Sequence, residues 1–95
     1  MRYLAFALVL IAPAAAAYDC EREQEGAASI MEARQSGEHP EEVIESAVED
    51  GAQEEAAERV TQVAFQRPRG ETEQERQEAV EQFGQEAYIN CRRRR

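Results

Sequence analysis

Apolar positions recur at helical spacing in four segments of the chain, and the clearest of these runs from Thr72 to Cys91. The apolar residues there are three or four positions apart, which places them on one stripe of an α-helix. Thr72 followed by Glu75 is a capping-box pattern, and it predicts that the helix starts at this point. The stripe consists of Val80, Phe83, Ala87 and Cys91.

Three earlier segments have the same periodicity, and each is followed by a turn signal. Helices are predicted from Asp19 to Ser36, from His39-Pro40 to Asp50-Gly51, and from Ala52 to Gln66 before Pro68. Their apolar faces comprise Cys20, Ala27 and Met31 in the first, Val43, Ile44, Ala47 and Val48 in the second, and Ala56, Val60, Val63 and Ala64 in the third.

Helices joined by short loops tend to be antiparallel neighbours. The prediction is therefore an all-α fold. It is a small antiparallel four-helix bundle, or three long helices with one short one, in which the first helix begins beside the end of the last.

Residues 1–17 have the pattern of a cleaved secretory signal peptide. Arg2 supplies the positive charge, Tyr3 to Ala12 form an apolar run too short to span a bilayer comfortably, and small residues after Pro13 provide a cleavage site. An uncleaved membrane anchor is the alternative. The expected product is a helical domain of residues 18–91 with a basic disordered tail of residues 92–95, and the expected location is periplasmic or secreted.

The chain contains 2 cysteines, and an even count in an exported chain predicts a disulfide. A bond between Cys20 and Cys91 would join the first and last helices and close nearly the whole domain. In the chain-entropy model a loop of this length adds about 4 kcal/mol to stability. A small domain without Leu or Trp after residue 17 needs such a link. Free thiols, intermolecular pairing and metal ligation are the alternatives.

The chain is strongly acidic, with 20 Asp and Glu against 11 Lys and Arg and a formal net charge of −9. A solvated surface that keeps the protein soluble is the simplest interpretation, and a docking face for a cationic partner is the functional one. The basic residues Arg92 to Arg95 would stabilise the C-terminal end of a helix or bind an anionic lipid surface. Membrane contact is therefore expected only through this tail. No nucleic-acid partner is predicted, because the domain is acidic and has no aromatic platform.

Catalytic and metal-binding signals are weak. His39 is the only histidine, and its position before Pro40 fits an exposed cap residue. A zinc site of Cys20, Cys91 and His39 has suitable ligand types but lacks closely spaced cysteines. No serine lies in a nucleophile elbow, and the C-x-x-C redox motif is absent. The prediction is a non-enzyme with no metal and no cofactor.

Three segments, IMEARQSG at residues 30–37, RPR at 67–69 and FGQEAYINC at 83–91, stand out together with Cys20. They resemble a group of small, exported, functionally uncharacterised helical proteins of bacteria and phages with a terminal cysteine pair and the motifs IMxARQxG and FxxxAYxxC. The resemblance covers nearly all of the chain after the signal segment. It implies the helical fold and the disulfide, and it implies no mechanism. A looser likeness, in size and layout alone, is to small periplasmic acid-stress chaperones.

The expected function is that of a non-catalytic protein-binding or accessory protein whose partner is another exported or envelope protein. Arg34, Arg67, Arg69 and Tyr88 are the candidate contact residues, because Arg and Tyr are enriched in interfaces. A purely structural role is the alternative for each. The alternative function is a stress-responsive or acid-responsive chaperone, in which protonated glutamates loosen the fold. No particular oligomeric state is predicted.

Overall fold

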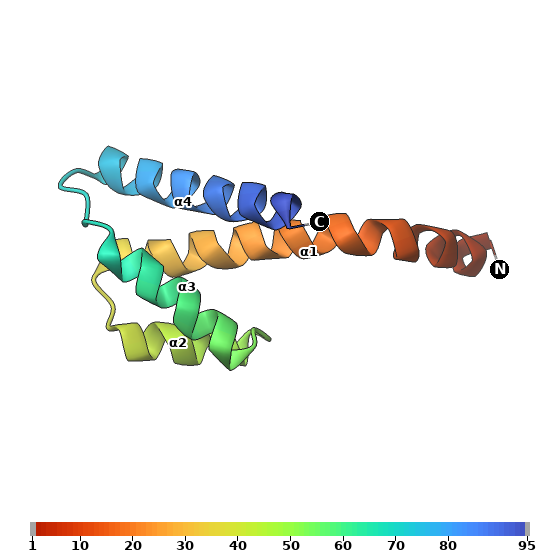
Figure 1. Ribbon diagram of the computed structural model, residues 1–95, viewed down its shortest axis with the longest axis horizontal. Helices are drawn as coiled ribbons and strands as arrows, with labels where there is room; N and C mark the ends of the chain where they lie inside the picture. The colour runs from red at the N-terminus through yellow and green to blue at the C-terminus, as the bar shows by residue number, and fades with distance from the viewer. Residues whose placement is uncertain (1, 95) are drawn as a thin grey trace.

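The computed structural model describes the backbone of residues 2–94 and the side chains from Asp19 to Arg94. This part of the chain forms four helices and no strand (Figure 1). The helices are α1 (Arg2–Ser36), α2 (Pro40–Glu49), α3 (Glu54–Gln66) and α4 (Glu73–Arg93). The predicted all-α four-helix fold is confirmed. The side chains of the predicted signal segment lie outside the described residues, so its cleavage stays a prediction.

Local sequence signals explain where the helices begin. The Thr72 hydroxyl accepts a hydrogen bond from the Glu75 N–H at 3.1 Å, as the capping pattern predicts. The Glu75 carboxylate in turn accepts from the Glu71 N–H at 2.8 Å. α2 has Pro40 in its first turn, and its N-cap residue His39 makes no side-chain capping bond.

Three helix boundaries differ from the predicted ones. α1 begins at Arg2 and not at Asp19, because the helix continues back through the alanine-rich sequence that precedes Asp19. α3 begins at Glu54 and not at Ala52, because Gly51 adopts a φ of +109° and the Ala52 N–H still bonds to the Ala47 carbonyl at 3.0 Å. α4 continues past Cys91 to Arg93. Cationic side chains stabilise the negative end of a helix dipole, so residues predicted to begin a disordered tail extend the helix instead.

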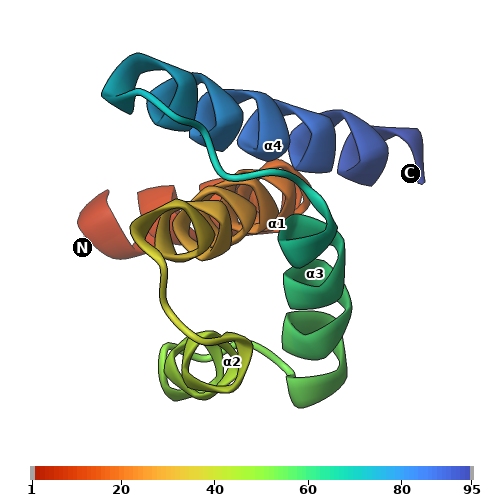
Figure 2. The same ribbon diagram turned by 90° about the vertical axis from the view of Figure 1, so that its left-hand side faces the viewer.

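α1 is the central element of the fold. α4 packs antiparallel along one side of α1, and the α2–α3 pair packs on another side (Figures 1 and 2). The end view in Figure 2 shows α4 and the α2–α3 pair separated by α1. α3 crosses α1 obliquely, so the two outer layers diverge from their connecting loop.

The buried core is small. It consists of Ala27, Ile30, Met31, Val43, Ala64 and Phe83, with Phe65 and several alanine and valine side chains packed at its margin. Two valines of the predicted apolar faces are substantially exposed, Val48 at 40% and Val63 at 39%. Their faces extend beyond the area that neighbouring helices cover.

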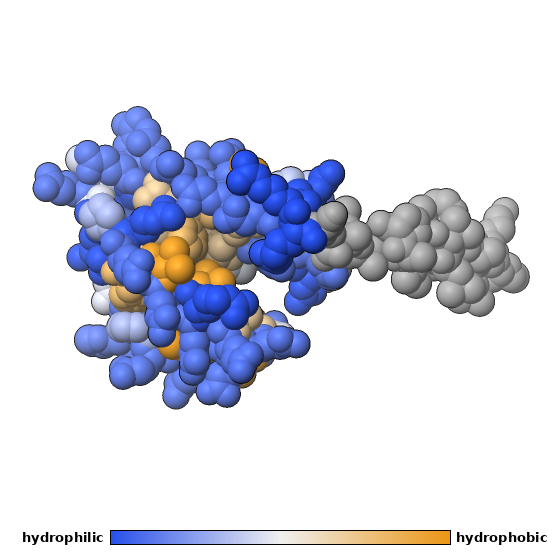
Figure 3. All heavy atoms as spheres, in the orientation of Figure 1, coloured by the Kyte–Doolittle hydropathy of each residue, from blue (hydrophilic) through white to orange (hydrophobic). Residues whose placement is uncertain are grey.

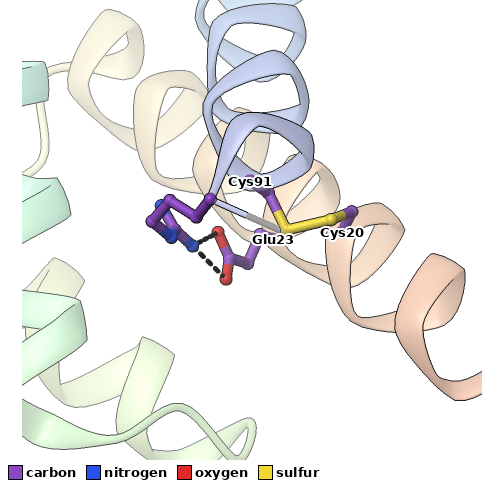
Figure 4. A network of polar contacts seen from close by, with 4 residues as sticks. Cys20, Glu23 and Cys91 are labelled. Carbon is purple, nitrogen blue, oxygen red and sulfur yellow. Dashed lines mark hydrogen bonds and ion pairs between the residues drawn. A yellow bond between two sulfur atoms is a disulfide. The ribbon is translucent and has the colours of Figure 1, made fainter.

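The disulfide between Cys20 and Cys91 ties α1 to α4. The two Cα atoms lie 5.5 Å apart across a sequence separation of 71 residues, and both cysteines are buried. The predicted pairing is confirmed, and neither cysteine is free. Figure 4 shows Glu23 beside this bond, and the Glu23 carboxylate accepts hydrogen bonds from Arg94 Nη2 at 3.0 and 2.9 Å.

Candidate functional site

A groove opens between α4 and the α2–α3 pair, above the exposed side of α1. Its volume is about 1230 Å³. α3 diverges from α1 while α4 runs alongside α1, so the two layers separate with distance from the loop that connects them (Figure 1). The apolar lining of the groove is Ala27, Ile30 and Ala33 from α1, Val43 and Ala47 from α2, Ala56, Ala57, Val60 and Val63 from α3, and Phe83 and Ala87 from α4.

The floor of this groove is part of the hydrophobic core. Ile30, Val43 and Phe83 line the groove and also belong to the buried cluster. Val60 is half-buried, and Val63 exposes more than a third of its surface. Figure 3 shows apolar residues in a hollow of the surface, surrounded by hydrophilic ones. The margin of the core, where half-buried side chains such as Val60 pack against it, is therefore exposed to solvent along one side.

Charged residues form the rim of the groove. Two ion pairs lie there, Arg67 with Glu86 at 2.8 Å and Arg94 with Glu23 at 2.9 Å. Four further rim carboxylates and one rim guanidinium, that of Arg59, form no ion pair within the described residues. These carboxylates belong to Glu25, Glu32, Glu38 and Asp50.

A second cluster of polar side chains fixes the loop between α3 and α4 to the end of α1. Arg34 Nε and Nη2 donate to the Arg67 carbonyl at 3.2 and 3.0 Å. Gln35 is only 3% exposed; its Nε2 donates to the Pro68 carbonyl at 3.2 Å, and its Oε1 accepts from the Gly70 N–H at 2.8 Å. Arg69 Nε donates to the Gln35 carbonyl at 2.7 Å. Side chains of α1 thus replace water as the partners of this loop.

Three of the four candidate contact residues, Arg34, Arg67 and Arg69, meet in this cluster. Each side chain has an intramolecular partner, as expected for the purely structural role that is the alternative to contact with a partner protein. Arg67 alone of the three also lines the groove, and its guanidinium lies 5.2 Å from the centre of the Phe83 ring.

Tyr88 lies apart from the cluster, half-buried on α4. Its hydroxyl accepts a hydrogen bond from Arg92 Nη1 at 2.9 Å, and the Arg92 guanidinium lies 5.7 Å from the ring centre. This contact holds one of the terminal arginines against the helix.

Sequence reasoning missed Gln35, the most buried polar side chain of the loop cluster. The available signal was its position four residues after Met31, on the buried face of the first helix. A polar residue on such a face indicates a hydrogen-bonded partner, because burying an unpaired amide is costly.

The described residues contain no group of three or more His, Cys, Asp or Glu side chains that could hold a metal ion. Both cysteine sulfurs are bonded to each other, so the alternative zinc site with His39 does not form. From residue 19 to residue 94, no helix is long and apolar enough to cross a membrane. Within residues 19–94, the groove is a surface feature of about 1230 Å³ that the chain's own helices leave uncovered.

Comparisons with protein-family models, with curated proteins and with solved structures found no match for this chain. Its function has to be inferred from the groove and from the charges around it.

Proposed function

We propose that this protein is a non-catalytic binding protein that holds an apolar segment of another protein in the groove between α1, the α2–α3 pair and α4. The observation that carries the proposal is that the margin of the hydrophobic core of the domain opens into this groove. Apolar surface left in contact with water is unfavourable by about 25 cal/mol per Å², so a partner that covers it gains binding energy.

The frame around the groove is suited to binding. The Cys20–Cys91 bond holds α4 against α1, and the loop cluster holds the end of α3 against α1. Two walls of the groove are therefore fixed before a partner arrives. A preformed site loses less conformational entropy on binding, and this raises affinity.

The disulfide also bears on location. Disulfides form and persist in oxidising compartments, which indicates an environment other than the cytoplasm. The signal pattern of residues 1–17 supports the finer proposal of a periplasmic or secreted protein. Its partner would then be another exported or envelope protein.

The test is a pull-down from an extract of exported proteins, with the disulfide-bonded protein as bait at low and high salt. The same bait is used as Val63→Gln, which changes the groove, and as Val48→Gln. Val48 has nearly the same exposure as Val63, 40% against 39%, and does not line the groove. We expect a partner that remains bound at high salt, is lost with Val63→Gln and is kept with Val48→Gln.

Equal capture by both variants would place the contact elsewhere and overturn the proposal. No capture at either salt would also overturn it. Binding of a hydrophobic dye that appears only at acid pH would then favour the chaperone alternative.

A further inference from the structure

Resting on this proposed function, we infer that the segment held in the groove is a cationic amphipathic helix of the partner protein. Its apolar stripe would lie on the floor of the groove, and its Lys or Arg side chains would face the carboxylates of the rim. Shape, spacing and charge each support this occupant.

The volume of the groove suits a short helix. An α-helix with side chains is about 10 Å wide, so each ångström of its length fills roughly 80 Å³. A groove of about 1230 Å³ therefore accommodates about 16 Å of helix, which is about ten residues. Amphipathic helices commonly bind in grooves of this kind through apolar residues at positions i, i+3 or i+4, and i+7.

The charge of the rim selects the partner. In the ion pairs of Arg67 with Glu86 and of Arg94 with Glu23, the two charges neutralise each other. The remaining carboxylates of the rim, those of Glu25, Glu32, Glu38 and Asp50, outnumber the single guanidinium of Arg59. The rim is therefore negatively charged, as is the whole chain with its net charge of −9. A partner of the same sign would be repelled, and a cationic one would be attracted.

Spacing adds a further constraint. Glu25 and Glu32 are seven residues apart on α1, so they lie on one side of the helix, about two turns from each other. Basic residues seven positions apart on a helix docked along α1 would meet both carboxylates. An apolar stripe beside those basic residues would lie on the floor of the groove and contact Val60 and Val63.

The probe for this inference is a synthetic helical peptide of about fifteen residues, with a leucine stripe, flanking lysines and a fluorescent label. Its binding to the disulfide-bonded protein is followed by fluorescence anisotropy. We expect Val63→Gln to weaken binding about tenfold and Val48→Gln to change it by less than about twofold, because only the first side chain lines the groove.

A second pair of variants tests the charges. Glu25→Gln with Glu32→Gln should weaken binding about threefold to tenfold and reduce its salt dependence. Glu41→Gln with Glu45→Gln removes the same net charge from exposed positions of α2 outside the groove, and it should leave affinity nearly unchanged. A peptide with glutamate in place of lysine should not bind.

If the two double variants weakened peptide binding equally, the peptide would be attracted to the acidic surface as a whole, and the inference would be overturned. Binding of the acidic peptide at similar affinity would do the same, as would a dimer of the protein that Val63→Gln dissociates. If the pull-down finds a groove-dependent partner but the cationic peptide does not bind, this inference fails and the proposed function stands. If the peptide binds in the groove but no protein partner is captured, the proposed function fails and the chemistry of the groove is as inferred.

Discussion

The α1–α4 pair and the α2–α3 pair differ in how they are held. α1 and α4 lie antiparallel from the Cys20–Cys91 disulfide to the end of α1, and they are joined by this buried bond and by the Arg94–Glu23 ion pair. α2 and α3 are shorter, neither has a side-chain N-cap bond, and they leave Val48 and Val63 exposed. The comparison shows that one pair forms a rigid frame and the other forms a wall of the groove.

The largest expected effect comes from removing the link in the rigid pair. Replacing both cysteines, Cys20→Ser with Cys91→Ser, should lower the free energy of unfolding by about 4 kcal/mol, because the unfolded chain regains the freedom of a 71-residue loop. Urea unfolding followed by circular dichroism measures this loss. The native protein should lose a similar amount under reducing conditions. A change below about 1 kcal/mol would mean that α1 and α4 hold together without the bond.

The next effect concerns the cluster that connects the two pairs. Gln35→Ala leaves the Pro68 carbonyl and the Gly70 N–H without their side-chain partner, and should destabilise the protein by about 2 kcal/mol. Gln77→Ala, at an exposed position of α4, is the control and should stay within about 0.5 kcal/mol of the native protein. Equal effects of the two variants would contradict the role assigned to Gln35.

A smaller effect distinguishes two glycines. A Cβ at Gly84 would lie 3.3 Å from both Ala28 Cβ and the Gln24 carbonyl oxygen, so Gly84→Ala should push α4 from α1 and cost about 1 kcal/mol. Gly26 on α1 has no neighbouring atom within 4 Å of such a Cβ. Gly26→Ala should therefore stabilise the helix by about 0.5–1 kcal/mol. Thermal unfolding compares the two, and a stabilising Gly84→Ala would show that the helices separate easily.

The smallest effect is expected in the wall formed by α3. Thr61 is 1% exposed, and its hydroxyl has no hydrogen-bond partner within the described residues. Thr61→Val keeps the shape and removes the unpaired group, so it should stabilise the protein by up to about 1 kcal/mol. Thr61→Ser keeps the hydroxyl and loses the methyl group, so it should destabilise. A loss of stability with valine would indicate that the hydroxyl does have a partner.

Sequence alone predicted the four helices, although not every boundary, and it favoured the disulfide over its alternatives. Thr72, Gly37 and Pro68 mark helix ends through backbone geometry and hydrogen bonds within a few residues, and such signals are local. The pairing of Cys20 with Cys91 follows from an even cysteine count and from antiparallel helices joined by short loops.

Only the tertiary structure decided which apolar side chains stay uncovered and which polar ones are buried. The periodicity of α3 places Val63 with Val60 and Ala64 on one face, but its exposure depends on the angle at which α3 crosses α1. Arg34, Arg67 and Arg69 meet because the loop between α3 and α4 returns to the end of α1, more than thirty residues away along the chain. Packing angles and contacts over such separations depend on all the side chains at once, whereas the helical pattern depends on a few neighbours.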